Sequence, residues 1–424
     1  MAAAVPLRRN RDFVLFQLGQ LLSDAGGGTT TIAYPLLALA LTHSPARAGV
    51  VTFARTLPLA LLALPAGLLA DRWNRKWLMI GADGVRAIGV GVLAGLIVAG
   101  HADFWVLPVV AVVEGSCTAV FTAAQSGALR NVVPLEQVPS AVGVQSGRTA
   151  VVELAGSPLG GALFAIARAV PFVVDAASYA FSTGSLLAIL TPFQQVRERD
   201  RSSIRQRMAE GLRYLWGEPF LRTCALLFGV ANFIIPGLLL ALVVLADRRG
   251  LSGGEVGLLV AVFGASLLIG SFLSSLVRRK LGARQVMLLE LWTYVGCVVF
   301  LVWPSVFVLA ACLVPTGLAI VPNDSVVHGY RIAMTPDRLL GRAESVRSMI
   351  SLVLAPLGPL VAGVLLSVSS PRVTIGVFFG IGVVLAAWGT LSPSIKAAPN
   401  LDDVIAAASR SAAVATTDPP PAGC

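Results

Sequence analysis

The chain has 424 residues, of which 56% are hydrophobic and only 13% are charged, with a formal net charge of +10. Soluble domains carry about 25% charged residues, so this chain cannot cover a water-facing surface and a soluble globular fold is excluded. The length suits many apolar spans of about 20 residues each, as in an integral membrane protein. The basic excess alone would fit a nucleic-acid partner, but its placement along the chain indicates another role.

Apolar segments bounded by charged residues, Pro or Gly follow one another along the chain. We predict twelve transmembrane helices, at residues 13–41, 47–70, 77–99, 104–129, 139–166, 171–193, 221–246, 254–277, 285–302, 306–329, 346–368 and 373–392. An even number of spans puts both termini on one side of the membrane. With that side in the cytoplasm, the opposite loops hold only five basic residues: Arg47, Arg168, Arg248, Arg249 and Arg372. The positive-inside rule therefore predicts a multi-pass protein of the inner (cytoplasmic) membrane with both termini cytoplasmic, and no nucleic-acid partner.

A long polar interruption, residues 197–220, separates six spans from six. Within it Met208, Leu212, Leu215 and Trp216 recur at helical spacing, which favours an amphipathic helix on the membrane surface over a solvated linker. The two halves of the sequence show a weak internal repeat, since "DRWNRK" at 71–76 matches "RKLGAR" at 279–284. We predict an all-α polytopic fold of two pseudo-symmetric six-helix bundles. The predicted parts are the bundles 1–196 and 221–395, the cytoplasmic linker 197–220 and a disordered cytoplasmic tail, 396–424.

One short turn concentrates charge, because "GLLADRWNRK" at residues 67–76 joins two apolar spans. Asp71 ends the second span, where the free carbonyl groups of the helix carry partial negative charge, so this acid needs compensation. Arg72 and Arg75 are local candidates, and the N-terminus of another helix is a remote one.

The same turn resembles the signature between the second and third helices of the major facilitator superfamily, roughly Gly-x-x-x-Asp-Arg-x-Gly-Arg-Arg/Lys. Three further stretches are similar to its branch of proton-coupled drug and siderophore exporters, which includes macrolide-efflux and enterobactin-exporter-like proteins: "DGVRAIGVGVLAG", "MAEGLRYLWGEPFLR" and "LLGRAESVRSMISLVLAPLGPLVAGVLL". The resemblance covers residues 10–395 and implies the twelve-helix fold, alternating access and efflux. Asn74 stands where the signature has Gly, and we expect it to make a left-handed reversal. "AGSPLGG" in the fifth span departs from the fuller Gly-Pro motif of related antiporters.

The resemblance also implies a conformational latch in the charged turn. In this family the acid matching Asp71 docks on the eleventh helix when the cytoplasmic side is closed, and here that helix would start near 345–348. We expect Asp71 to hold the bundles together in the outward-facing state; the alternative is that the charges only fix topology and the turn. Arg279 occupies the matching place in the second half, so the latch would be one-sided. Asp83 and Arg86 lie three positions apart on one face of the third span and could extend the charge network of the turn. The residues assigned to the latch are Gly67, Asp71, Arg72, Asn74, Arg75, Lys76, Asp83 and Arg86.

Ionisable residues inside apolar spans are functional candidates, because a charge near the bilayer centre costs at least ~2.5 kcal/mol and needs a partner or a wet cavity. Asp24 precedes "GGG" at 26–28, where close backbone approach is expected, and it leads the candidates for proton or cation binding. Glu114 and Arg148 are expected to form a pair, with Glu153 as a free acid; alternatively, Arg148 and the acids hold a carboxylate substrate. The residues assigned to the proton-coupling and substrate cavity are Asp24, Glu114, Arg148, Glu153 and Asp324.

Two other charged residues within spans are given structural roles. Arg55 lies about one turn into the second span and is expected to snorkel toward the membrane surface. Glu290 lies early in the ninth span, where we expect it to support packing.

We predict a secondary active transporter that uses the proton gradient to expel a small amphipathic molecule, such as a drug, antibiotic or siderophore, by alternating access. An importer of a small nutrient with the same fold and a non-transporting membrane scaffold or sensor remain alternatives. The sequence holds no Gly-x-x-x-x-Gly-Lys-Ser/Thr, His-Glu-x-x-His or Gly-x-Ser-x-Gly motif and only 3 His, so neither ATP drive nor an enzyme is expected. The expected partners are the small-molecule substrate, protons and the lipid bilayer, for a monomer without cofactor or metal.

Overall fold

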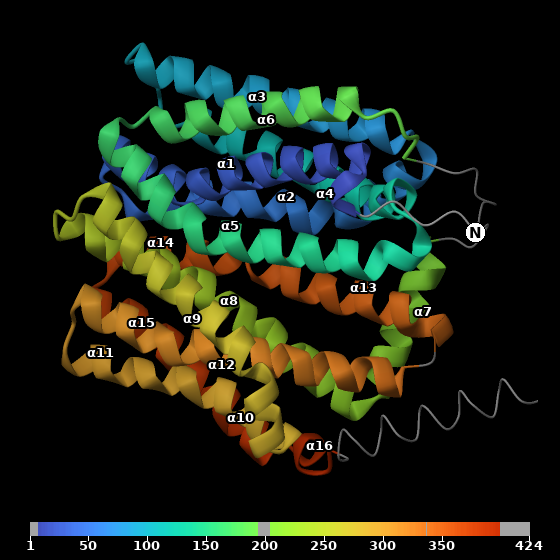
Figure 1. Ribbon diagram of the computed structural model, residues 1–424. Helices are drawn as coiled ribbons and strands as arrows, with labels where there is room; N and C mark the ends of the chain where they lie inside the picture. Colours follow the sequence, from blue (N-terminus) through green and yellow to red (C-terminus); the bar gives the residue numbers. More distant parts are fainter. Residues whose placement is uncertain (1–6, 194–203, 336, 399–424) are drawn as a thin grey trace, which may run out of the picture.

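The computed structural model describes residues 7–193, 204–335 and 337–398 of the chain. Within these ranges the protein is helical and has no strand (Figure 1). Its helices are α1 (Arg11–Thr42), α2 (Pro45–Arg72), α3 (Arg75–Val98), α4 (Val106–Val132), α5 (Val138–Ile166), α6 (Val170–Ala188), α7 (Ile204–Gly217), α8 (Pro219–Arg248), α9 (Gly253–Lys280), α10 (Ala283–Thr293), α11 (Val298–Val302), α12 (Val306–Met334), α13 (Asp337–Leu354), α14 (Leu357–Val368), α15 (Pro371–Leu391) and α16 (Pro393–Lys396), with 3-10 turns η1 (Leu7–Arg9), η2 (Leu135–Gln137) and η3 (Tyr294–Cys297).

All twelve predicted spans coincide with helices, although two of them are interrupted. The ninth is α10, η3 and α11 in succession, and the eleventh breaks between Leu354 and Leu357 into α13 and α14. In the described part of the chain, ten segments are long and apolar enough to cross a membrane. The first and sixth predicted spans, α1 and α6, are not among these ten. Both carry runs of Ser, Thr or Gly and a buried or half-buried Asp, which lower their apolar character.

Short-range signals in the sequence explain several helix ends. The Asn10 side chain accepts a hydrogen bond from the Phe13 amide and starts α1, while Ser252 and Glu255 form a capping box at the start of α9. Pro45 and Pro371 begin α2 and α15, where a missing amide hydrogen is harmless. The apolar spans thus begin and end at defined residues.

The helices form two groups that lie side by side (Figure 1). We call α1–α6 the N-terminal half and α8–α15 the C-terminal half. Helix pairs that join them include α1 with α8, α2 with α8, α2 with α13, α2 with α14, and α5 with α9. One end of the molecule, at the right in Figure 1, holds the N-terminus and α7, and we call it the terminus side; the opposite end is the loop side.

Glycines bring the two halves into backbone contact near the loop side. A methyl group added to Gly363 of α14 would lie 3.0 Å from the Cα of Gly49 in α2. A methyl group on Gly161 of α5 would lie 3.0 Å from the Cα of Gly257 in α9. The Ala46 amide also donates to Ser367 Oγ of the other half at 2.9 Å. These contacts close the loop side.

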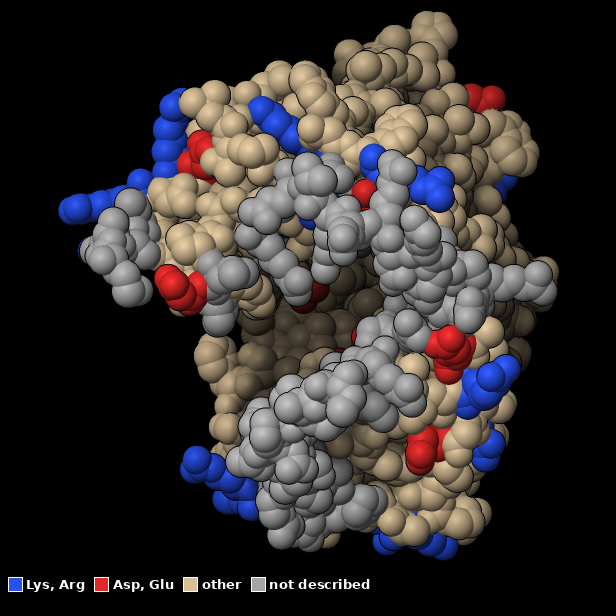
Figure 2. Space-filling model, turned by 90° about the vertical axis from the view of Figure 1, so that its right-hand side faces the viewer, with Lys and Arg blue, Asp and Glu red and all other residues tan. Residues whose placement is uncertain are grey.

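The terminus side is open between the halves. Figure 2 looks onto this side and shows a deep hollow between the N-terminal half and the C-terminal half, bordered by residues of both. A transporter that alternates between two accessible sides would have this shape when it is open to the terminus side only.

The linker between the halves contains the predicted helix, α7, which packs against α13 and α8. Leu215 of this helix is buried, and the Tyr214 hydroxyl donates to the Met334 carbonyl at 2.7 Å. The helix is therefore attached to the C-terminal half. The predicted linker residues 197–203, the Met208 side chain and tail residues 399–424 lie outside the part that the structure describes.

Candidate functional site

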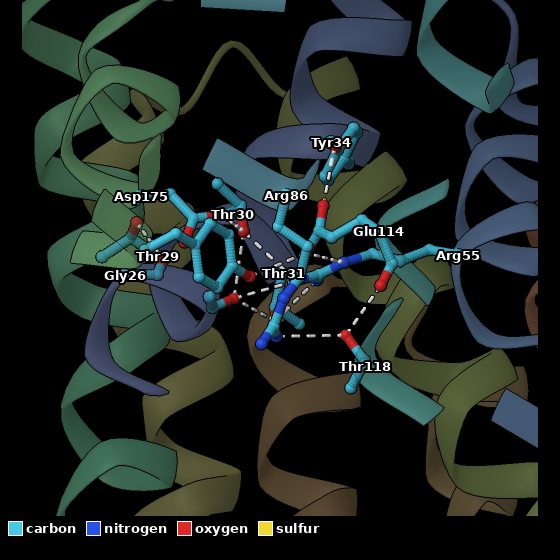
Figure 3. A network of polar contacts seen from close by, with 12 residues as sticks. Gly26, Thr29, Thr30, Thr31, Tyr34, Arg55, Arg86, Glu114, Thr118 and Asp175 are labelled. Carbon is cyan, nitrogen blue, oxygen red and sulfur yellow. Dashed lines mark hydrogen bonds and ion pairs between the residues drawn. The ribbon is translucent and has the colours of Figure 1, made fainter. Parts of the chain in front are cut away.

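Glu114 of α4 forms the centre of a buried polar network in the N-terminal half (Figure 3). Only 2% of its side chain is exposed, and its Oε1 accepts from Arg55 Nη2 at 2.7 Å and from Arg55 Nε at 3.1 Å. Its Oε2 accepts from the Tyr34 hydroxyl at 2.8 Å, and the Tyr179 hydroxyl lies 3.4 Å from Oε1. Two hydroxyls and a guanidinium from three other helices thus surround one carboxylate.

The Arg55 guanidinium connects α2 to the polar stretch of α1. Its Nη1 donates to Thr31 Oγ1 at 2.9 Å, and its Nη2 donates to the Gly27 carbonyl at 3.0 Å and to Thr30 Oγ1 at 3.2 Å. The side chain is largely buried, so its charge depends on Glu114 and these oxygens for stabilisation. Removing one partner of a buried ion pair destabilises a protein by about 3–5 kcal/mol.

Asp175 of α6 lies on the other side of Thr30 in the same network (Figure 3). The Thr30 hydroxyl is 2.9 Å from Asp175 Oδ2, and the Asp175 side chain is fully buried. Its Oδ1 has no hydrogen-bond partner among the described residues. Gly26 leaves the space for this carboxylate, since a methyl group there would come within 2.8 Å of Oδ1.

Asp83 and Arg86 of α3 extend the network. They form a buried ion pair with each other, and the Arg86 guanidinium lies over the Tyr179 ring at 4.4 Å from its centroid. Arg86 Nη1 also reaches Thr118 Oγ1 at 3.4 Å, and that hydroxyl donates to the Glu114 carbonyl at 2.8 Å. Both residues were expected in the latch. They lie instead in the interior of the N-terminal half.

A second polar group lies at the junction of α1 and α5. Arg148 Nη2 is 3.1 Å from Asp24 Oδ2, and Arg148 Nη1 donates to Gln17 Oε1 at 3.0 Å. The Asp24 side chain is 39% exposed, whereas that of Arg148 is buried. Both helices also contact the C-terminal half, α1 through α8 and α5 through α9.

The structure overturns two predicted arrangements. Glu114 was expected to pair with Arg148, but its cation is Arg55, and Arg148 pairs with Asp24 instead. Arg55 was expected to snorkel to the membrane surface, yet it points inward to Glu114. Both errors have one cause: chain spacing gives a residue's depth in the membrane, but the rotation of each helix decides which partner it meets.

Glu153 and Asp324 are exposed and are not joined to the buried network by a described hydrogen bond. Glu153 lines a shallow pocket of about 410 Å³ along α5 with Val142, Gln145, Ser146, Thr149 and Ala150. Asp324 lies in α12 of the C-terminal half, next to the buried Asn323. Of the five predicted cavity residues, the structure therefore pairs only Asp24 with Arg148.

In the C-terminal half, Glu290 is buried and accepts from the Tyr294 hydroxyl at 3.0 Å. The packing role expected for it agrees with that position. Near the end of α12, Arg331 Nη1 lies 2.6 Å from Glu344 Oε2, and Arg347 Nη2 lies 2.5 Å from Glu344 Oε1. This small cluster ties α12 to α13.

The charged turn between α2 and α3 differs in detail from its prediction. Asn74 has φ −64° and ψ 114°, so the expected left-handed reversal is wrong. Its side chain instead caps α3 by accepting from the amides of Lys76 and Trp77. Lys76 Nζ donates to the Ile189 carbonyl at 2.6 Å and ties the turn to the end of α6.

Asp71 is 69% exposed and lies 3.5 Å from Arg75 Nη2, its i+4 neighbour. Arg72 is exposed as well, and no atom lies within 4 Å of the place where a side chain on Gly67 would begin. The side chain of Ser345, at the predicted docking point, is outside the described part. Docking of Asp71 on the eleventh helix therefore stays a prediction.

Sequence reasoning missed Asp175 and the hydroxyl groups around it. A signal was available, since Asp175 lies four residues into the predicted sixth span, where an acid is as unfavourable as in any other span. The supporting hydroxyls of Thr30, Tyr34 and Tyr179 had no such signal, because these residues are common in membrane helices for packing reasons alone.

Comparison with known proteins fits this architecture. The family model described as "Transmembrane secretion effector" matches residues 1–366. The chain belongs to this family of the major facilitator superfamily. It is therefore a membrane transporter of that superfamily, with an all-α polytopic fold.

A curated relative of this transporter is the multidrug efflux pump Tap of Mycolicibacterium fortuitum, which is 25% identical over 393 residues, or 86% of this chain and 94% of that one. A bacterial homologue of the lysosomal transporter Spinster, in an inward-facing structure, has a TM-score of 0.66 at 18% identity and covers 98% and 100% of the two chains. A bacterial homologue of the iron transporter ferroportin has a TM-score of 0.70 at 16% identity in its inward-facing state, covering 91% and 99%. Its outward-facing state gives 0.59 at 17% identity, covering 90% and 98%.

Proposed function

We propose that this transporter expels a small amphipathic molecule, of the drug, antibiotic or siderophore class, in exchange for protons. In this proposal the terminus side faces the cytoplasm of the inner membrane, and the substrate enters the hollow from there. The bias of basic residues toward the terminus side supports the orientation. The greater similarity to the inward-facing than to the outward-facing ferroportin homologue supports it as well.

The Asp24–Arg148 ion pair carries this proposal. Asp24 is partly exposed, lies on a helix that contacts the other half, and has Arg148 at 3.1 Å as its described ion-pair partner. A cationic group on a substrate, or a proton, competes with Arg148 for this carboxylate. Because the pair joins α1 to α5, such competition changes the contact between two helices that border the other half.

Efflux rather than uptake is proposed because the relative named above is an efflux pump. The pocket along α5 beside Glu153 combines Val142 and Ala150 with polar side chains, a mixed lining that would suit an amphipathic molecule. The two halves would then exchange which end is closed, with the glycine contacts of the loop side opening as the terminus side closes.

The test is transport of ethidium, a fluorescent lipophilic cation, into everted membrane vesicles with an imposed pH gradient. The wild type should take up the dye, and nigericin should abolish uptake by collapsing the gradient. Asp24→Asn should reduce the rate at least about tenfold, equivalent to about 1.4 kcal/mol. Asp103→Asn, the same change in a loop residue, is the matched control.

Three results would oppose this proposal. Uptake by intact cells that express the protein, relative to cells without it, would indicate an importer. Transport that never responds to the pH gradient, for any compound tested, would refute proton coupling. Equal rates for Asp24→Asn and Asp103→Asn would remove Asp24 from the site.

A further inference from the structure

We propose that Asp175 is the carboxyl group that carries the transported proton, while Asp24 meets the substrate. This inference rests on the proposed proton coupling. It assigns the coupling site to α6, behind the wall of the hollow, and separates that site from the Asp24–Arg148 pair.

The first argument is the balance of charge within the buried network. Asp83 pairs with Arg86, and Glu114 pairs with Arg55. Asp175 is the third carboxyl group, and it forms no ion pair within the described part of the chain. An isolated carboxylate buried away from water is strongly disfavoured, and binding a proton removes its charge.

The second argument is the number of hydrogen bonds that Thr30 can make. Its Oγ1 has three polar neighbours: Arg55 Nη2 at 3.2 Å, the Gly27 carbonyl at 3.1 Å and Asp175 Oδ2 at 2.9 Å. A hydroxyl donates one hydrogen bond and accepts two. If Asp175 holds a proton and donates to Thr30, the Thr30 hydroxyl accepts from Asp175 and Arg55 and donates to Gly27, so all three contacts are made at once.

When Asp175 is ionised, the same hydroxyl has to turn. Thr30 then donates to Asp175 and leaves the Gly27 carbonyl, which still accepts from Arg55 Nη2 at 3.0 Å. Thr30 is thus a two-position link between the proton site and the Arg55–Glu114 pair. Thr30 keeps its hydrogen bond from Arg55 in both states, and only its hydroxyl hydrogen moves between the Gly27 carbonyl and Asp175.

Charged and titratable groups face Asp175 from each helix packed around it. They are Tyr34 from α1, Arg55 from α2, Asp83 and Arg86 from α3, Glu114 from α4 and Tyr179 from α6 itself. The charged residues of α5 are engaged elsewhere, Arg148 with Asp24 and Glu153 on the exposed surface. Both arginines are already matched by carboxylates, so none of these groups offers Asp175 a cation of its own.

The proton step balances without any other reactant. A proton from water on one side of the membrane adds to an oxygen of the Asp175 carboxylate and forms the neutral acid. In the alternate conformation the same proton returns to water on the other side and restores the carboxylate. In the present state the Asp175 side chain is fully buried, so the proposal requires that the transport cycle expose it to water on each side in turn.

Infrared spectroscopy of the purified full-length protein tests the protonation directly. Glu290 is a second buried carboxyl group without a described cation, so the spectra are taken in a Glu290→Gln background. That protein at neutral pH should show the carbonyl band of a neutral carboxylic acid, and adding Asp175→Asn should remove it. Asp24→Asn should keep the band. Thr30→Val should keep it at a shifted frequency, because the hydrogen bond from or to Thr30 is gone while the acid remains.

Transport in liposomes tests the coupling. With the membrane potential clamped at zero, exchange of one proton for one ethidium cation supports up to about tenfold accumulation of the dye per pH unit. Asp175→Asn should lose this accumulation yet still exchange labelled for unlabelled ethidium, which also shows that the variant folds. Asp24→Asn should lose both, because it affects substrate binding.

The outcomes separate this inference from the proposed function. A band that persists when Asp175→Asn is added to the Glu290→Gln background, or accumulation equal to wild type in Asp175→Asn, would overturn the assignment of Asp175 alone. A wild type that exchanges ethidium but never responds to the pH gradient would overturn proton coupling and, with it, the carrier role.

Discussion

The two halves share a helical plan but place their charged residues differently. In the N-terminal half, Asp83, Arg86, Glu114 and Asp175 are all buried among helices. In the C-terminal half the described ion pairs lie near the terminus side, around Glu344, and are partly exposed. Glu290 is buried there, but its described partner is a tyrosine and not a cation. The comparison shows that the described buried ion pairs lie in the N-terminal half, while those of the C-terminal half are partly exposed.

The largest difference between the halves should be in the loss of stability when a buried glutamate is replaced, Glu114 in one half and Glu290 in the other. Glu114→Gln leaves the buried Arg55 guanidinium without its carboxylate and should lower the free energy of unfolding by about 3–5 kcal/mol. Glu290→Gln keeps a side chain that can accept a hydrogen bond from Tyr294, so the free energy of unfolding should fall by only about 1 kcal/mol. Denaturant unfolding of the two purified variants in detergent measures both. Equal losses would show that the buried charges of the N-terminal half have no special energetic role.

Substituting a glycine at the loop-side contact should have the next largest effect, a shift in the population of the two conformations. Gly363→Leu forces a side chain against Gly49 of the other half and should cost about 1–3 kcal/mol in the present conformation. The population should therefore shift by a factor of at least about five toward a state with the loop side open. Distances between spin labels on the two halves report this shift. Gly95→Leu in α3, where no other part of the described chain lies within 4 Å of the added Cβ, is the control and should leave the population unchanged.

The latch prediction has a smaller expected effect. Asp71 is exposed and its described ion pair is a surface pair, which contributes up to about 1 kcal/mol. If Asp71 holds the outward-facing state, Asp71→Asn should change the ratio of inward- to outward-facing molecules by up to about fivefold. Accessibility of single cysteines on the terminus side measures that ratio. Arg279→Gln alters the matching position of the C-terminal half and should leave the ratio unchanged; no change in either variant would rule out the latch.

The smallest effect is expected from the exposed cluster of the C-terminal half. Glu344→Gln loosens the contact between α12 and α13 but leaves Arg331 and Arg347 partly in water, so stability should fall by about 1 kcal/mol or less. Ethidium transport should remain within about twofold of wild type, since this corresponds to well under 1 kcal/mol. A loss as large as that of Asp24→Asn would show that the C-terminal half holds a second essential charged site.

The positions of the helices could be predicted from the sequence because apolar composition is a local property. Each predicted span coincides with a helix, and α7 was foreseen from four spaced apolar residues. The interruption in the eleventh span was not foreseen, although Pro356 lies in it. Proline marks where a break can occur, but several other prolines, such as Pro158, lie within continuous helices.

Partners within the site could not be predicted in the same way. Asp24, Glu114 and Arg148 were recognised as unusual because each is a charge within an apolar span. Which of them meet depends on how each helix is rotated about its axis, and rotation follows from packing over the whole half. The expected close approach at residues 26–28 was right, since Gly28 lies against Gly156 of α5.

The low apolar character of α1 and α6 has a consequence for how the protein is made. Neither α1 nor α6 is among the ten segments of the described chain that are long and apolar enough to cross a membrane. Thr30 of α1 bonds to Asp175 of α6, and Asp24 of α1 pairs with Arg148 of α5. We therefore expect the first helix to be held insecurely in the bilayer during synthesis, until more than a hundred further residues have been added. The order of translation, and not only the final packing, would then decide whether α1 inserts.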